Sequence, residues 1–136
     1  MSGDSSPFND LLGIKLVKWR EGHAVAELNA APLHMNRTGW LHGGVLCTLL
    51  DTVCSRAGCW SPSDRRIRSS TISLTINFSR ATQSGLLTAM GTLRPGAGSS
   101  IFSATGEVVD AQGQLIALAQ GTFKYRPGHT PRDALA

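Results

Sequence analysis

Hydrophobic and polar positions alternate through most of the second half of the chain. The clearest case is residues 69–79, where threonine, serine and asparagine separate large apolar residues at every second position. These apolar residues are Ile72, Leu74, Ile76 and Phe78. An alternation with a period of two predicts a strand that buries one of its two faces.

Five further runs have the pattern or the composition of strands. They are residues 14–19, 23–28, 86–93, 101–109 and 115–125. Short stretches containing glycine follow most of these runs and are typical of hairpin connections. We therefore expect a sheet of about six strands that pair antiparallel.

The segment of residues 42–60 has the spacing of a helix instead. Its apolar residues recur three and four positions apart. They are Val45, Leu46, Leu49, Leu50, Val53 and Ala57. The segment contains no Lys and no Glu, so a helix of about 16 to 18 residues here is too apolar for a solvated position. Six antiparallel strands wrapped around this one helix, which enters between the second and third strands, give an α+β fold.

Length and composition are those of one globular domain. The chain has 136 residues, of which 41% are hydrophobic and 16% are charged, and no shift in composition marks an internal boundary, so we expect a single domain over residues 1–136. Residues 1–6 and 127–136 are predicted to be loosely ordered, and residues 8–12 to form a short helical turn. No run approaches the roughly 18 apolar residues of a membrane span, and the polar start is unlike a signal peptide. These features indicate a cytoplasmic protein with no membrane partner.

The chain has a small net positive charge. Thirteen Lys and Arg against nine Asp and Glu give a formal charge of +4, which favours anionic partners but is too scattered to indicate nucleic acid. The one basic cluster is Arg65, Arg66 and Arg68. It is compatible with a solvated loop and with a phosphate contact for an anionic ligand.

The cysteines and histidines are not spaced as in a metal or redox site. Three cysteines lack a CxxC pair, and we expect buried, reduced thiols and no catalytic cysteine. They are Cys47, Cys54 and Cys59. The four histidines show no paired ligand spacing, so we expect no metal and no cofactor.

The predicted helix and the residues just before it contain candidate catalytic groups. Asp51 lies in its middle, where neither helix propensity nor hydrophobicity favours a carboxylate. Just before the helix, His42-Gly43-Gly44 places two glycines where a ligand can approach the free N–H groups of a helix start. Such donors stabilise an acyl oxygen that becomes anionic, as in an oxyanion hole. Taken singly, Asp51 also fits an exposed stripe, the glycine pair a simple turn, and His42 a helix cap or a core position.

Taken together, these residues resemble a known family. Asn36, then Gly43 after six intervening residues, then Asp51 eight residues later, is similar to the pattern of hotdog-fold acyl-coenzyme A thioesterases of the phenylacetate-degradation (PaaI-like) type. The resemblance extends from about Phe8 to Tyr125. It implies a long central helix wrapped by a curved antiparallel sheet, assembly as homodimers or as homotetramers built from dimers, and hydrolysis of an acyl-coenzyme A thioester.

The resemblance also implies roles for individual residues. Asp51 matches the carboxylate that acts as general base or nucleophile, and the Gly43 N–H matches the donor to the thioester carbonyl. Asn36 corresponds to the residue that places the carbonyl or the attacking water, and His42 to a supporting hydrogen-bond partner. The hydroxyl that assists the carboxylate falls at Ser69, or at the adjacent Ser70 if the loop is shifted by one residue. We expect substrate contacts from the remaining candidates, which are Gly44, Ser70, Arg65, Arg66 and Arg68.

Helix geometry then requires a second subunit. Eight residues of helix separate Gly43 from Asp51 by a rise of about 12 Å, whereas the acyl carbon and oxygen must lie about 3 Å from the attacking atom and the donor. Asn36 and Gly43 of one subunit are therefore predicted to face Asp51 and Ser69 of its partner, with two sites in a two-fold homodimer.

Two other functions are compatible with such a fold. Hotdog hydratases pair an Asp with a His five residues later, but this chain has Arg56 there, which makes hydration the weaker alternative. A non-catalytic module that binds acyl-coenzyme A is the other, because a fold alone does not establish catalysis. Aromatic and medium-chain acyl groups are both compatible with the sequence, and the large apolar residues Phe8, Trp40 and Trp60 are candidates for lining the acyl site.

Overall fold

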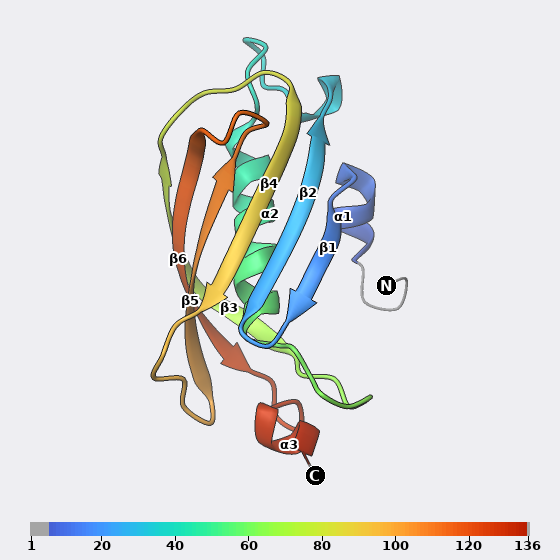
Figure 1. Cartoon of the computed structure of the whole chain (residues 1–136), viewed down its shortest axis with the longest axis vertical. Coiled ribbons are helices and arrows are strands. Elements are labelled where there is room, and N and C mark those ends of the chain that lie inside the picture. The colour runs from blue at the N-terminus through green and yellow to red at the C-terminus, as the bar shows by residue number, and fades with distance from the viewer. Residues whose placement is uncertain (1–5, 136) are drawn as a thin grey trace.

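The computed structural model describes residues 6–135 and contains one six-stranded antiparallel sheet curved around a helix (Figure 1). The strand order is β1-β2-β4-β5-β6-β3, which leaves β1 and β3 at the two edges. The strands are β1 (Lys15–Arg20), β2 (His23–Ala30), β3 (Ser69–Phe78), β4 (Gly85–Leu93), β5 (Ile101–Val109) and β6 (Leu115–Tyr125). The predicted α+β class, the number of strands and their antiparallel pairing are confirmed.

The helix wrapped by the sheet is α2 (Gly43–Ala57), which lies between β2 and β3 in the chain, as predicted. It packs very closely on the sheet because β4 and β5 place two glycines opposite each other beneath it, Gly91 and Gly106. A Cβ atom on Gly91 would lie 2.2 Å from the backbone oxygen of Val53, and one on Gly106 would lie 2.9 Å from the Cys54 sulfur. Side chains at these two positions would push the helix away from the sheet, so the glycines determine how closely α2 packs on β4 and β5.

An aromatic cluster fills the core beyond the end of α2. The rings of Phe102 and Phe123 stack with their centroids 5.0 Å apart, and Tyr125 lies 4.7 Å from Phe102. The Tyr125 hydroxyl donates a hydrogen bond of 2.9 Å to the carbonyl oxygen of Gly58, the residue that ends the helix. The cluster therefore fixes the point at which the chain leaves α2.

The edge strand β3 differs from the alternation predicted for it. Its pairing with β6 shifts by one residue between Thr71 and Ser73, and the face that points to the core changes from odd to even positions at that shift. Leu74 packs against the core, but Ile72 is 55% exposed and Phe78 is 57% exposed. The expectation that both of these residues lie on a buried face is therefore wrong. Within residues 6–135 no strand pairs with the outer edge of β3, so an unpaired strand that exposes Ile72 and Phe78 forms this edge of the sheet.

Both ends of the described part of the chain are held to the body. Helix α1 (Pro7–Leu12) confirms the predicted helical turn and is capped by Ser6, whose side chain accepts a hydrogen bond from the N–H of Asn9. The predicted loose order of residues 1–5 lies outside the described residues, as does that of residue 136. Residues 127–135, also predicted to be loose, instead end in helix α3 (Pro131–Leu135) with a buried Ala134. A 3-10 helix, η1 (Pro32–His34), follows β2. None of the described helices combines the length and the apolar character needed to cross a membrane.

Candidate functional site

A cavity of about 590 Å³ opens beside the middle of α2, and Asp51 lies in its wall. Asp51 is the only carboxylate in this helix and is half-buried. The hydroxyl of Thr71 on β3 donates a hydrogen bond of 2.7 Å to Asp51 Oδ1. The other walls come from α1, from neighbouring turns of α2 and from β3. They include Phe8, Asn9, Cys47, Thr48, Thr52 and Leu74. A positioned carboxylate at the edge of a cavity with polar and apolar walls is an arrangement suited to acid–base or nucleophilic chemistry.

The hydroxyl beside Asp51 is therefore not one of the two expected. Ser69 Oγ accepts a hydrogen bond of 3.4 Å from the thiol of Cys59. Ser70 is exposed, and as the intervening residue of the strand it points to the opposite face from its neighbours. Thr71 lies two residues after Ser69 on the same face of β3, so the period of the strand was the available signal for it.

The start of α2 presents a free donor. The His42 ring caps the helix, because its Nδ1 atom accepts a hydrogen bond of 2.8 Å from the N–H of Gly44. The Gly44 N–H, expected to contact substrate, is therefore already occupied. The N–H of Gly43 has no hydrogen-bond acceptor among the described residues. A Cβ atom on Gly43 would lie 3.3 Å from the Phe78 ring, so that ring covers one side of the helix start. An unpaired N–H at the positive end of a helix attracts an anionic oxygen.

Asn36 organises the loop that leads to this helix. Its Oδ1 atom accepts hydrogen bonds from the Thr38 N–H and hydroxyl, both at 2.9 Å, and from the Trp40 N–H at 3.1 Å. The amide nitrogen of its exposed side chain has no acceptor within the described part of the chain. It is therefore available as a donor near the start of α2.

One chain does not bring all the predicted residues together. Neither Asn36 nor Gly43 lines the cavity that contains Asp51, and the helical rise between Gly43 and Asp51 is about 12 Å. Asp51 and Thr71 lie toward the unpaired edge formed by β3.

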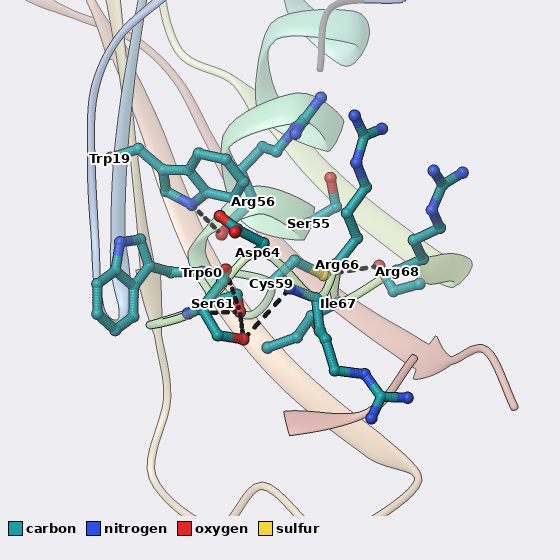
Figure 2. A pocket seen from close by; sticks show the side chains of 13 residues that line it. Trp19, Ser55, Arg56, Cys59, Trp60, Ser61, Asp64, Arg66, Ile67 and Arg68 are labelled. Carbon is teal, nitrogen blue, oxygen red and sulfur yellow. Dashed lines mark hydrogen bonds between the residues drawn. The ribbon is translucent and has the colours of Figure 1, made fainter. Parts of the chain in front are cut away.

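A second cavity, of about 700 Å³, lies where the chain leaves α2 (Figure 2). All three arginines of the basic cluster line it, together with Arg56 and one carboxylate, Asp64. Figure 2 shows Trp19 beside Arg56 on one side of this cavity and Arg66 and Arg68 on the other. The arginine cavity, as we call it, is strongly cationic and suited to binding phosphate groups.

Trp19 and α2 hold one wall of the arginine cavity in place. The Trp19 indole N–H donates a hydrogen bond of 2.8 Å to the carbonyl oxygen of Arg56, and the Arg56 guanidinium lies 5.1 Å from the centre of the indole ring. Ser55 and Arg56 line both cavities. The cationic cavity and the one that contains Asp51 therefore share a wall one turn along the helix from the carboxylate.

The three aromatic residues predicted to line the acyl site do not lie in one cavity. Phe8 of α1 lines the cavity with Asp51, and Trp60 lines the arginine cavity. Trp40 lines neither of the two and is 42% exposed.

Two of the three cysteines, Cys54 and Cys59, are not activated as nucleophiles. Burial, and the nearby charge of Asp51, raise the pKa of Cys54 to about 12. Burial also raises the pKa of Cys59, an effect that outweighs its hydrogen bond to Ser69. Cys47, expected to be buried, is only half-buried and lies in the wall of the cavity with Asp51.

Known proteins resemble this chain in sequence and in fold. A family model described as the thioesterase superfamily matches residues 38–117. The PaaI protein of the phenylacetic acid degradation operon of E. coli is 26% identical, with 95% of this chain and 90% of that chain covered and a TM-score of 0.79. A conserved protein from Pseudomonas aeruginosa is 27% identical, with 90% and 95% covered and a TM-score of 0.79. A thioesterase from Haemophilus influenzae is 23% identical, with 92% and 86% covered and a TM-score of 0.82. No match was found among curated protein sequences.

Proposed function

Because the chain belongs to the thioesterase superfamily and is a PaaI-like thioester hydrolase with the hotdog fold, we propose that it hydrolyses acyl-coenzyme A with Asp51 as its catalytic carboxylate. The observation that carries this proposal is the hydrogen bond from Thr71 to Asp51 at the wall of an open cavity. The bond fixes one carboxylate oxygen and leaves the other available for a water molecule or for the substrate.

Two chemical routes are compatible with this carboxylate. In the first, Asp51 takes a proton from water, the oxygen of that water attacks the thioester carbon, and the C–S bond breaks to release the thiol of coenzyme A. In the second, the carboxylate attacks the carbon directly, the C–S bond breaks and coenzyme A leaves as its thiolate, and water then hydrolyses the resulting anhydride to the free acid and the Asp51 carboxylate. Both routes place negative charge on the carbonyl oxygen, so both require a hydrogen-bond donor to that oxygen.

We assign that donor to the Gly43 N–H of a second subunit. The N–H is unpaired among the described residues, and the helix dipole makes it a favourable partner for an anionic oxygen. The separation of about 12 Å from Asp51 of the same chain is too long for one thioester. The unpaired edge of β3, next to Asp51 and Thr71, supports an approach by the partner there. In this arrangement Asn36 of the partner helps to place the carbonyl or the water, and His42 holds the helix start in position.

The arginine cavity supports coenzyme A as the leaving group. Coenzyme A carries three phosphates, and guanidinium groups bind phosphates with paired hydrogen bonds. Arg65, Arg66 and Arg68 are assigned to these phosphates, with the shared wall at Ser55 and Arg56 connecting them to the reacting end of the molecule. In the cavity with Asp51, Phe8 provides an apolar surface for the acyl group.

The proposal is tested with Asp51→Asn and Asp51→Ala, assayed against phenylacetyl- and medium-chain acyl-coenzyme A. Loss of a proton-transfer group or nucleophile should lower kcat about 10²-fold or more, while thermal unfolding stays close to that of the wild type. Glu107→Gln is the matched control, because this exposed carboxylate on the sheet lies outside both the arginine cavity and the cavity with Asp51, and it should retain full activity. Full activity in both Asp51 variants would overturn the assignment.

A further inference from the structure

The C-terminal segment is bonded along its length to the loop that carries the three arginines. We call residues 126–135 the strap. The N–H of Arg126 donates to the Arg68 carbonyl at 2.8 Å, and the N–H of Arg68 donates to the His129 carbonyl at 3.1 Å. His129 Nδ1 lies 3.1 Å from the Arg66 carbonyl oxygen. The first two contacts hold the backbone of Arg68, and the third involves the carbonyl oxygen of Arg66.

The far end of the strap is anchored in the core. Ala134 is 3% exposed and belongs to the same buried cluster as Ile67, the residue between Arg66 and Arg68. The hydroxyl of Ser63, at the start of the loop, donates a hydrogen bond of 2.8 Å to the Ala134 carbonyl. The loop is therefore tied to the strap at both ends and packed against it in the middle.

Helix α3 holds the strap in shape. Asp133 Oδ2 accepts hydrogen bonds from the Thr130 N–H at 2.9 Å and from the Thr130 hydroxyl at 2.7 Å, and the Thr130 hydroxyl receives the Asp133 N–H at 3.1 Å. These reciprocal bonds cap the helix. The bonds from Thr130 lower the pKa of Asp133, with smaller contributions from the charges of Arg65 and His129.

A loop whose backbone is held in place can bind an anion more tightly through its arginines. Arginine side chains have many rotamers, so several of them bind one ligand well only if their backbones are held where the guanidinium groups converge. The arginines of the loop are exposed and line one cavity, and the loop between Ser61 and Arg68 has no helix or strand of its own. The strap supplies the missing backbone constraint.

We propose that the strap is a positioning element for the phosphate-binding arginines, and that it sets the affinity for the phosphate-bearing part of the substrate without taking part in hydrolysis. The identity of that substrate rests on the function proposed above. The positioning role itself is independent of hydrolysis, because it concerns the binding of phosphate groups in the arginine cavity.

The test uses two variants and one control. One variant ends the chain after Gly128, and the other is Asp133→Ala, which removes the cap of α3 while retaining the full strap. Arg132→Ala is the control, because it removes an exposed charge from the same helix and none of the bonds named above. Binding of adenosine 3′,5′-bisphosphate is measured by calorimetry, with adenosine as the probe that lacks phosphate.

The expected result is a Kd for the bisphosphate that rises about tenfold or more in the truncated chain and by a smaller factor in Asp133→Ala, with Arg132→Ala close to the wild type. In the hydrolysis assay, KM for acyl-coenzyme A should rise by the same factors at constant kcat. Turnover of the matching acyl N-acetylcysteamine thioester, which has no phosphates, should stay unchanged.

Three results would overturn the proposal. The first is an unchanged Kd in both variants, and the second is no binding by the wild type. The third is an equal loss of activity toward both thioesters, since that indicates general damage to the fold. A wild-type protein that binds the bisphosphate but hydrolyses no thioester would instead overturn the proposed function, while the binding measurements still test the strap.

Discussion

Replacing Thr71 by Val tests whether this residue positions the catalytic carboxylate. Val has nearly the same shape as Thr, so the substitution removes the hydroxyl that donates to Asp51 Oδ1 at 2.7 Å and little else. Thr71 is exposed on an edge strand, so no buried polar group is left without a partner elsewhere. The expected effect is therefore confined to the orientation of Asp51.

The size of this effect follows from the type of hydrogen bond. A bond to a charged group contributes about 1.5–3 kcal/mol, which corresponds to a loss of roughly 10- to 150-fold in kcat if the bond must hold in the transition state. We expect kcat to fall within this range in a steady-state assay with acyl-coenzyme A, with a KM close to that of the wild type. Thr71→Ser, which keeps the hydroxyl, should recover most of the activity.

The matched comparison is Ser69→Ala. Ser69 bonds to Cys59 and not to Asp51, so this variant should keep its kcat within about twofold of the wild type. Full activity in Thr71→Val combined with a large loss in Ser69→Ala would show that Thr71 does not position Asp51. It would mean that the assisting hydroxyl is Ser69, as the resemblance to the family implies, and not the residue that bonds to Asp51 in this structure.

Two further predictions concern the core and the thiols. Gly91→Ala should destabilise the fold by about 3 kcal/mol or more, because the new Cβ meets the backbone oxygen of Val53 at 2.2 Å. Thermal unfolding checks this against Gly98→Ala, whose Cβ meets nothing closer than 3.9 Å, and equal melting temperatures would contradict it. Iodoacetamide at pH 8 should alkylate only Cys47 of the native chain and reduce hydrolysis, because the other two cysteines are buried with raised pKa values. Mass spectrometry counts the adducts, and rapid labelling of all three thiols would rule out the packing described.

The sequence predicts the central part of the fold well because one physical pattern dominates there. The apolar spacing between residues 42 and 60 predicts α2 well. The helix buries most of its surface, so packing restricts which side chain fits at almost every position. The inner strands β4, β5 and β6 have nearly the predicted bounds because each has one face on the core. Identification of Asp51 rests on the same pattern, since a carboxylate in so apolar a helix is conspicuous.

The corrections at β3 and at the C-terminal strap arise where structure depends on distant parts of the chain. In β3 a one-residue shift in pairing with β6 changes which positions face the core, and a period of two along a single segment does not indicate where such a shift falls. Thr71 faces Asp51 ahead of this shift, whereas Leu74 faces the core after it. The strap is ordered by hydrogen bonds to a loop about 60 residues away in the chain, and its local composition is that of a loose end.

A variant that removes only the proposed donor can be made at the first position of α2. Proline lacks the N–H and is well tolerated there, since its fixed backbone angle suits a helix start. The preceding His42 already has the extended backbone that a following proline requires, with ψ of 133°. Gly43→Pro should therefore abolish oxyanion stabilisation in a folded protein, and Gly43→Ala, which retains the N–H beside the same Phe78 ring, should lose much less activity.

The most direct test of a site shared between subunits is to mix Gly43→Pro with Asp51→Asn after dissociating and reassociating the dimers. With equal amounts and random pairing, half of the dimers are hybrids, and each hybrid has one site with both defects and one with neither. The mixture should recover about a quarter of the wild-type activity, although each parent is nearly inactive. Mixed dimers that form but stay as inactive as the parents would contradict it, because a site built within one chain has no intact copy in any of them.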